Sequence, residues 1–433
     1  MNFVPNTDMQ KKEMLKVIGV ADTKALFADI PEKLHLNSLN IPKGMSEIEL
    51  RRHMEKLAAK NKPMLSFQGA GAYNHFIPAV VDKITSRSEF YTAYTPYQPE
   101  ISQGILQAIF EYQTMICELT GMDVANASMY DGASAMGETA VICKIKTKRN
   151  EIIISRTVHQ EYIDTVKTYA KANEMKVIEV GFEKGLTDME ELQKHLSENT
   201  AGVLVQSPNF FGMIEPLEKI GKLTHDKGAV FVVGVVEATS LGLFKSPGEL
   251  GADIVVGEGQ SYGNGVNFGG PYLGIMAVKN EFMRNIPGRL VGETVDEKGR
   301  KGYVLTLQAR EQHIRREKAT SNICSNEALC ALAATVYLSM MGKKLKDLAL
   351  MNYHKAHYAY SELKKAGHNV LGDGFYNEFV VEVDEMAFER ALGENIVPGI
   401  KLSGLYPDKN HLLICVTEMM TKEDIDRLVE VLR

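Results

Sequence analysis

The run Val230-Phe-Val-Val-Gly-Val-Val contains no polar side chain, and Ile254-Val-Val further along the chain is equally apolar. A strand that faces water on one side alternates apolar and polar residues, whereas a strand covered by helices on both faces does not. Amphipathic stretches of helical length separate these runs and four similar ones, namely Ile152-Ile-Ile, Val177-Ile-Glu-Val, Val203-Leu-Val and Leu273-Gly-Ile-Met-Ala-Val. The alternation predicts an α/β fold with a large, mainly parallel sheet and crossover helices.

The regions on either side of this pattern set the predicted domain boundaries. Residues 1–68 are helical in pattern but too poor in apolar residues for a core of their own, and Ser46 precedes Glu49 in the spacing of a capping box. We expect a helical arm over 1–68 that lies over another body, followed by the large α/β domain over 69–340. Residues 341–433 mix helical and strand patterns, which predicts a small C-terminal α+β domain.

Composition excludes several classes of protein. The chain has 433 residues, of which 45% are apolar and 24% charged, and its net charge is −6 without any basic run. These values favour a globular protein and argue against nucleic acid as a partner. No apolar stretch approaches the roughly 18–20 residues that cross a bilayer, so we expect no membrane association. The cysteines are odd in number and scattered, which indicates free thiols in a reducing cytoplasm: Cys117, Cys143, Cys324, Cys330 and Cys415.

Two glycine-rich segments are candidates for ligand binding. Residues 131–138 place Gly132 and Ser134 at the start of a helical pattern, where backbone N–H groups could hold a phosphate or where the residues could simply cap the helix. Residues 257–271 carry six glycines between 257 and 270 directly after a strand pattern. That segment is either a tight connection or a ligand loop, since ligands bind at the carboxyl ends of strands in open α/β sheets.

Polar and aromatic residues outside these loops leave alternatives open. Residues 91–104 hold three tyrosines and two prolines within nine residues, which predicts a stiff loop that either presents phenol hydroxyls or only connects two helices. His159 could stack on a planar ring or be an internally hydrogen-bonded histidine. Arg310–Lys318 is expected to be the solvated face of a helix, with Arg315 and Arg316 able to hold an anion. The histidines show no metal-ligand spacing, so no metal is expected.

Four long segments carry a resemblance to a known family. They are Met14-Leu-Lys-Val-Ile-Gly-Val, Glu89-Phe-Tyr-Thr-Ala-Tyr-Thr-Pro-Tyr-Gln-Pro-Glu-Ile-Ser-Gln-Gly, Gly251-Ala-Asp-Ile-Val-Val-Gly-Glu-Gly-Gln and Arg310-Glu-Gln-His-Ile-Arg-Arg-Glu-Lys-Ala-Thr-Ser-Asn-Ile-Cys. Through them the chain resembles subunit 1 of the two-subunit P-protein of the glycine cleavage system, the decarboxylating glycine dehydrogenase. The resemblance implies a pyridoxal-phosphate (PLP) dependent transferase fold of the aminotransferase type. In that fold a lysine binds PLP as a Schiff base and an aspartate pairs with the pyridine nitrogen.

The sequence departs from this pattern at the lysine. In the catalytic subunit the lysine lies upstream of a Gly-Gly-Pro turn, and aligning that turn with Gly269-Gly270-Pro271 puts Gln260 at or near its place. A glutamine amide cannot form the imine. The nearest lysines, Lys245 and Lys279, lie outside the loop. Aliphatic residues also stand where the aspartate is expected, and the nearby Glu237 is expected to point away from the pyridine nitrogen. The resemblance therefore implies a chain that binds no PLP and keeps a degenerate cleft around Ser134, His159 and Gln260.

Two functions of different classes follow from the resemblance. In the first, the chain has no catalytic residues of its own but completes the active site of a PLP-bearing sister subunit, with Tyr94 and Tyr97 as the candidate contributors. The implied partners are P-protein subunit 2 in an α2β2 assembly, the lipoylated H-protein that accepts the aminomethyl group, and glycine. In the second, the chain is a silent scaffold. A more distant alternative is an autonomous PLP enzyme.

Overall fold

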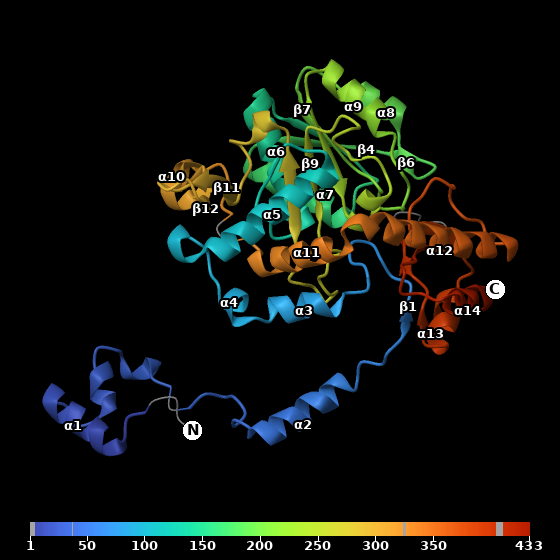
Figure 1. The fold of residues 1–433 in the computed structure, drawn as a ribbon. Coiled ribbons are helices and arrows are strands. Elements are labelled where there is room, and N and C mark those ends of the chain that lie inside the picture. Colours follow the sequence, from blue (N-terminus) through green and yellow to red (C-terminus); the bar gives the residue numbers. More distant parts are fainter. Residues whose placement is uncertain (1–4, 37, 324–325, 404–409) are drawn as a thin grey trace. The chain divides into compact units, whose positions relative to one another are not determined.

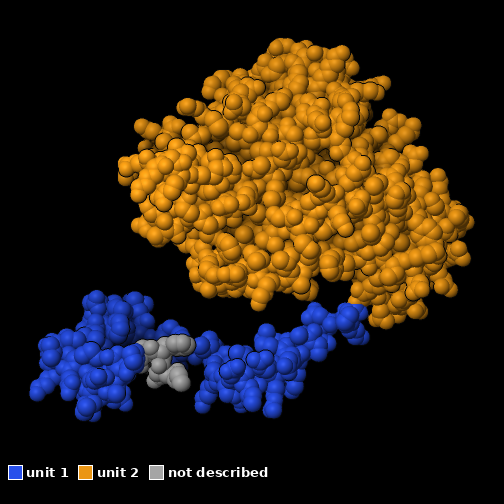
Figure 2. All heavy atoms as spheres, viewed as in Figure 1, with its two compact units in different colours: residues 1–63 blue, residues 64–433 orange. Residues whose placement is uncertain are grey.

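A computed structural model describes residues 5–36, 38–323, 326–403 and 410–433. The chain forms two compact units, unit 1 (Met1–Pro63) and unit 2 (Met64–Arg433), which Figure 2 distinguishes by colour. The first strand, β1 (Leu65–Ser66), pairs in parallel with β14 (Ile396–Val397), so the chain already belongs to unit 2 before residue 68. The boundaries expected after residues 68 and 340 stay predictions.

Unit 1 consists of short helices without a core. Helix α1 (Asp8–Ile18) and helix α2 (Glu47–Ala58) are joined through the 3-10 turns η1 (Thr23–Phe27) and η2 (Glu32–Leu34). The predicted capping box at the start of α2 is confirmed, because the Ser46 hydroxyl accepts the Glu49 N–H and the Glu49 carboxylate accepts the Ser46 N–H. None of the described residues of this unit is buried. Its helices therefore receive little stabilisation from packing.

The large sheet of unit 2 confirms the predicted α/β architecture. It has seven strands in the order β2-β10-β9-β8-β7-β3-β4. The strands from β9 to β4 run parallel to one another, and β10 is antiparallel to both of its neighbours. Their bounds are β2 (Val124–Ala125), β3 (Glu151–Ser155), β4 (Lys176–Val180), β7 (Thr200–Gln206), β8 (Val230–Val235), β9 (Ile254–Glu258) and β10 (Gly274–Val278).

Helices cover both faces of this sheet (Figure 1). One buried cluster joins the sheet to α6 and α7, and a second joins its other face to α5, α8, α9 and α11. Strands β7, β8, β9 and β10 are buried along their whole length, as expected for strands without polar alternation, whereas the edge strand β4 is mostly only partly buried. The helices are α3 (Ala79–Thr85), α4 (Ser88–Tyr91), α5 (Gln103–Thr120), α6 (Gly132–Thr147), α7 (Gln160–Ala172), α8 (Met189–His195), α9 (Leu217–Asp226) and α11 (Ala328–Met341).

The C-terminal part of unit 2 has its own core, as the strand and helix patterns predicted. Helix α12 and two terminal helices pack against a three-stranded antiparallel sheet in the order β13-β16-β15. Phe67 belongs to the same core and is fully buried. The elements are α12 (Leu345–Lys365), β13 (Glu378–Glu382), α13 (Ala387–Gly393), β15 (Ile400–Lys401), β16 (His411–Cys415) and α14 (Lys422–Leu432).

Strand β10 runs antiparallel within the mainly parallel sheet, although its apolar run looks like those of the parallel strands. One expectation about secondary structure is wrong. Residues 310–318 form only short turns, η6 (Gln308–Arg310), α10 (Gln312–Arg315) and η7 (Arg316–Lys318), instead of one helix. Arg310 explains part of this, because its guanidinium donates to the backbone carbonyls of Ile286 and Gly288 and so is not solvated. The short hairpins β5–β6 (Phe182–Glu183, Leu186–Thr187) and β11–β12 (Leu290–Val295, Lys301–Thr306) were not anticipated.

One described segment, Ala328–Lys365, is long and apolar enough to cross a membrane by length and composition alone, with 44% of its most apolar window buried. It comprises α11, the turn η8 (Gly342–Lys344) and α12. Because α11 contributes seven buried residues to the core, the segment has the character of a core helix pair in this fold.

Candidate functional site

The carboxyl ends of β3, β8 and β9 meet around a cleft that is filled by the chain itself. His159 follows β3, Glu237 follows β8 and Gln260 follows β9, which is the edge where open α/β sheets bind ligands. The occupant is the irregular segment that follows β1, which we call the 70–76 segment. Within it Tyr73 and His75 are 2% and 6% exposed.

Gln260 lies in this cleft and is saturated by backbone groups. Its side-chain oxygen accepts the Tyr73 N–H at 2.9 Å, and its side-chain nitrogen donates to the Tyr73 carbonyl at 3.0 Å and to the Asn264 carbonyl at 2.6 Å. The amide therefore pairs with Tyr73 much as a neighbouring strand would. At the position that the alignment gives to a Schiff-base lysine, this chain has a neutral side chain that binds its own backbone.

His75 and two carboxylates form the charged centre of the cleft. The His75 ring donates from Nε2 to Glu237 at 3.1 Å and from Nδ1 to Glu418 at 2.8 Å. Burial lowers the pKa of His75, but the charges and hydrogen bonds of Glu237 and Glu418 outweigh it and raise the pKa to about 10. Burial raises the pKa of Glu418, and its pairing with His75 more than reverses this, so the net shift is downward. His75 is thus a buried imidazolium.

Glu237 contacts His75 of the 70–76 segment, and the expectation that it points away from a pyridine nitrogen stays a prediction. Besides His75, its carboxylate accepts hydrogen bonds from Ser261 Oγ at 3.3 Å and from the Thr239 N–H at 2.9 Å. The side chain is 2% exposed and directed into the cleft. An acidic group therefore does stand after β8, but its counterion is a histidine of the same chain.

Glu378 and His159 also hold the first half of the 70–76 segment. The Ala70 N–H and the Tyr73 hydroxyl donate to the two oxygens of Glu378 at 2.7 and 2.8 Å, and burial raises the pKa of this carboxyl to about 7. His159 donates from Nε2 to the Ala70 carbonyl at 2.9 Å, while its Nδ1 accepts the Glu161 N–H as the cap of α7. Burial lowers the pKa of His159, so its neutral form is favoured. Of the two alternatives for His159, the internally hydrogen-bonded histidine fits.

The start of α6 is likewise closed by internal partners. Ser134 and Asp131 form a capping box with each other, so the Ser134 hydroxyl is engaged. The Gly132 N–H donates to the Glu258 carboxylate at 3.0 Å. Glu258 also accepts the N–H groups of Gln260 and Leu273, and its burial raises its pKa to about 7. A carboxylate of the chain therefore stands where a phosphate would meet the helix N-terminus.

These contacts decide the fit of PLP, the cofactor that the fold implies. A bound PLP needs an amine, a free acid for its pyridine nitrogen, an open face and a free anion cradle. In this chain Gln260 lacks the amine, Glu237 is paired, His159 is engaged and the N-terminus of α6 holds Glu258. His159 and Gln260 both contact the 70–76 segment, and Ser134 contacts Asp131 at the start of α6. That the three form one degenerate cofactor site stays a prediction, and the residues present do not fit PLP.

The tyrosines of the 91–104 loop lie at the surface. Tyr94 is 78% exposed, and Tyr97 is 47% exposed with its hydroxyl accepting a hydrogen bond from Arg289 at 2.9 Å. The Arg289 guanidinium also lies over the Tyr97 ring at 5.5 Å, and His313 meets the ring edge-on at 5.9 Å. Arg289 is 2% exposed and forms no ion pair with the residues that the structure describes. Because Arg289 supplies the donor, the phenol hydrogen of Tyr97 is available to an outside acceptor.

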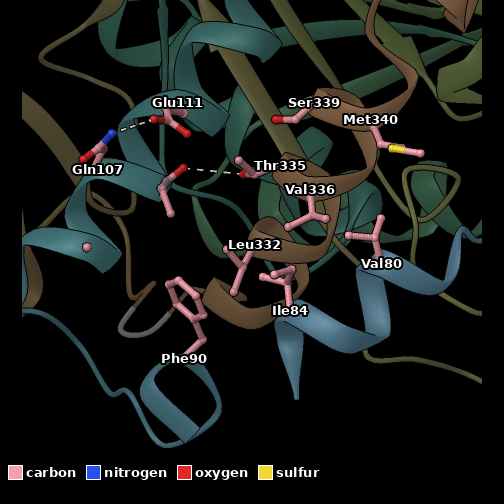
Figure 3. Close-up of a pocket in the computed structure, with 12 residues that line it drawn as sticks. Val80, Ile84, Phe90, Gln107, Glu111, Leu332, Thr335, Val336, Ser339 and Met340 are labelled. Atoms are coloured by element: carbon pink, nitrogen blue, oxygen red, sulfur yellow. Dashed lines mark hydrogen bonds between the residues drawn. The ribbon is translucent and has the colours of Figure 1, made fainter. Parts of the chain in front are cut away.

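An apolar groove of about 490 Å³ lies between α3, α4, α5 and α11 (Figure 3). Val80, Ile84 and Phe90 line one side, and Leu332 and Val336 of α11 line the other. Helix α4 leads directly into the tyrosine loop.

Across the described ranges no three His, Cys, Asp or Glu residues gather in a way that could hold a metal ion. The described cysteines, Cys117, Cys143, Cys330 and Cys415, are free thiols, and Cys324 lies outside the described residues.

Sequence reasoning missed the occupant of the cleft. The stretch from Phe67 to Tyr73 is glycine-rich but is no dinucleotide-binding motif, and His75 has no ligand-like neighbours in sequence. Glu378, the partner of Tyr73, lies 305 residues away and Glu418, the partner of His75, lies 343 residues away, so no local periodicity marks them. The available signal was the short Gly69-Ala-Gly71 motif after β1, which permits close approach of a backbone.

Comparisons with known proteins agree with this architecture. The family model of the glycine cleavage system P-protein matches residues 1–432. A probable glycine dehydrogenase (decarboxylating) subunit 1 of Desulfitobacterium hafniense is 54% identical over 99% of this chain and 98% of its own. A crystal structure of a glycine decarboxylase (P-protein) of the glycine cleavage system is 40% identical, with a TM-score of 0.93 and coverage of 100% and 99% of the two chains.

A more distant structure supports the fold alone. A NifS-like protein is 14% identical, with a TM-score of 0.63 over 85% of this chain and 98% of its own. The fold is thus the PLP-dependent transferase fold that the resemblance implied. With the family model spanning almost the whole chain and relatives above 50% identity over their full length, this chain belongs to the glycine cleavage system P-protein family.

Proposed function

We propose that this chain is the subunit of a glycine-decarboxylating P-protein that carries no PLP and completes the active site of a homologous PLP-bearing subunit. The observation that carries the proposal is that Gln260, at or near the place where the resemblance implies an imine-forming lysine, is neutral and binds the backbone of Tyr73. Curated relatives carry the name "subunit 1", which implies a second P-protein subunit as partner. PLP of that partner would serve as the electron sink when glycine loses CO2.

The exposed tyrosines supply the contribution to the partner's site. Tyr94 and Tyr97 project from a loop that the prolines Pro96 and Pro99 stiffen, and large exposed aromatic side chains are typical of contact surfaces. With Arg289 donating to its oxygen, Tyr97 can donate its own proton to a carboxylate or another anion. We propose that these two phenols line the site where glycine and the lipoyl arm of H-protein meet, in an assembly with two copies of each subunit.

The test is reconstitution of the complex. This chain and the sister subunit are co-expressed and purified, and glycine–bicarbonate exchange is measured with H-protein present and with each chain omitted in turn. The proposal expects exchange only when both chains are present, and PLP absorbance only from the sister subunit. Exchange by the sister subunit alone at the full rate would overturn it.

Substitutions of Tyr94 and Tyr97 distinguish the proposed function from the alternative of a silent scaffold. Tyr94→Phe and Tyr97→Phe leave the rings and the assembly intact, so a scaffold would keep its full exchange rate. A loss of exchange in an intact complex supports the catalytic contribution. An autonomous PLP enzyme would instead need an imine on this chain, for which the cleft offers no amine. The free thiols fit the reducing cytoplasm, which we propose as the location.

A further inference from the structure

We infer that the 70–76 segment, together with Glu258 of β9, is a built-in substitute for the cofactor: the segment engages His159, Glu237 and Gln260, and Glu258 closes the N-terminus of α6. The inference rests on the proposed function only for the statement that this cleft descends from a PLP site. The contacts themselves are independent of any partner, because every group involved belongs to this chain.

The substitution is one of matching charge. In the parent arrangement a protonated pyridine nitrogen faces an acid and a negative phosphate faces a helix N-terminus. Here the His75 side chain faces Glu237 at 3.1 Å, and the Glu258 carboxylate faces the N-terminus of α6 at 3.0 Å. An unpaired buried acid or an empty helix terminus would each be costly, so removing the cofactor required a replacement of the same sign at each place.

The segment also joins the two parts of unit 2. On the side of the large sheet it is held by His159, Glu237 and Gln260. On the side of the C-terminal core, Glu378 binds Ala70 and Tyr73, Glu418 binds His75 and the Phe76 N–H, and Thr417 donates to the Asn74 carbonyl at 2.7 Å. Separating these parts would break the whole set of contacts. The cleft of this chain is consequently locked rather than poised to bind and release a ligand.

Close packing makes the lock specific. A β-carbon at Gly69 would overlap the Glu378 carboxylate and approach Cys415 Cβ at 2.7 Å. Gly71 has a φ of +108°, and a β-carbon there would lie 3.4 Å from His159 Nε2. Both glycines are therefore required for the backbone to reach the bottom of the cleft.

The decisive experiment restores the missing amine. The full-length Gln260→Lys variant is mixed with PLP, and imine absorbance near 420 nm is recorded before borohydride reduction and peptide mass spectrometry. Because Tyr73 occupies the space beside residue 260, we expect no pyridoxyl adduct on that lysine, as in the unaltered chain. An adduct at position 260, with a rise in melting temperature on adding PLP, would overturn the inference by showing that the cleft is open.

Two further measurements keep the test independent of how that variant folds. Hydrogen exchange of the unaltered full-length chain should show the amides of Ala70 and Tyr73 protected at least about 1000-fold, as in the core strands. Protection below about tenfold would contradict a lock. His75→Ala should lower the melting temperature by about 3–5 °C and speed exchange across the segment, whereas the matched control His53→Ala, on exposed α2, should change neither. An unchanged His75→Ala variant would also overturn the inference.

These readouts separate the inference from the proposed function. If the segment is protected and position 260 stays free of PLP, but glycine–bicarbonate exchange does not need this chain, the proposed function alone fails. If exchange needs this chain but the lysine variant takes up PLP, only the inference fails.

Discussion

Replacing His75 with glutamine should produce a loss of stability that depends on pH. The pKa of His75 is about 10 in the folded chain, compared with 6.5 for an unperturbed histidine. The difference of about 3.5 units, at about 1.36 kcal/mol each, corresponds to at most about 5 kcal/mol of stability. Since the folded pKa is the higher one, this contribution is complete below pH 6.5 and disappears as the pH rises through 10. The groups that face the ring are Glu237, Glu418 and Tyr73.

The assay is denaturant unfolding of the full-length chain followed by far-ultraviolet circular dichroism, since the sequence has no tryptophan. At pH 6 the His75→Gln variant should unfold at least about 3 kcal/mol more easily than the unaltered chain, and at pH 10.5 the two should nearly coincide. Glu258 and Glu378 also have pKa values of about 7, and their raised values make stability fall between pH 4.5 and 7. This fall in stability occurs mostly below the pH range of 6.5 to 10 in which the His75 contribution disappears, and it is the same in the variant and the unaltered chain. A difference between the two that stayed constant from pH 6 to 10.5 would refute the buried imidazolium.

Substitutions at four other positions test the surface and the cleft. In the co-expressed complex, Tyr97→Phe should lower glycine–bicarbonate exchange at least about tenfold, and Tyr94→Phe should lower it by less. The reason is that Arg289 orients Tyr97, whereas no such contact is described for Tyr94. Full activity of both variants would remove the tyrosines from the site. Arg289→Met should reproduce the Tyr97→Phe defect with partial rescue by Arg289→Lys, and identical defects in the lysine and methionine variants would speak against orientation by a donated hydrogen bond. Glu258→Gln should cost about 1–3 kcal/mol in denaturant unfolding, since an amide oxygen cannot accept all three N–H groups, and a neutral effect would exclude a role in closing α6.

The parts of the fold with local periodicity could be predicted from the sequence. The apolar runs marked the parallel strands, and the Ser46 capping box marked the start of α2, because both patterns lie within a few residues of each other. The direction of β10 could not be predicted, because a strand buried on both faces is apolar whichever way it runs. Arg310 was misjudged for a related reason: its charge suggests solvent, but carbonyls of Ile286 and Gly288 satisfy it inside the protein.

The sequence could predict that Gln260 stands at or near the place of the lysine, but it could not predict that the 70–76 segment contacts Gln260. Gln260 could be singled out because its distance from the Gly-Gly-Pro turn is fixed along the chain. The 70–76 segment could not, because each of its contacts with Glu378 and Glu418 spans at least 305 residues. A buried histidine paired to two acids has no sequence signature, and its identity as a cation follows only from the three-dimensional surroundings.

On our proposal that this chain carries no PLP, the contacts of the cleft explain how the fold is kept without the cofactor. Deleting PLP alone would leave the acid after β8 and the N–H groups at the start of α6 buried without partners, and each such group costs more than an ordinary mutation. In this chain the His75 imidazolium faces Glu237, the Glu258 carboxylate faces the start of α6, and the Tyr73 backbone pairs with Gln260, the position that we propose for the missing lysine. The replacement is therefore cooperative: adding back the lysine restores one of four requirements, while Ala70 still engages His159, His75 still pairs with Glu237 and Glu258 still closes the start of α6. Return to a PLP-binding chain would need several simultaneous changes, which leaves the surface loop with Tyr94 and Tyr97 as the part free to serve a partner.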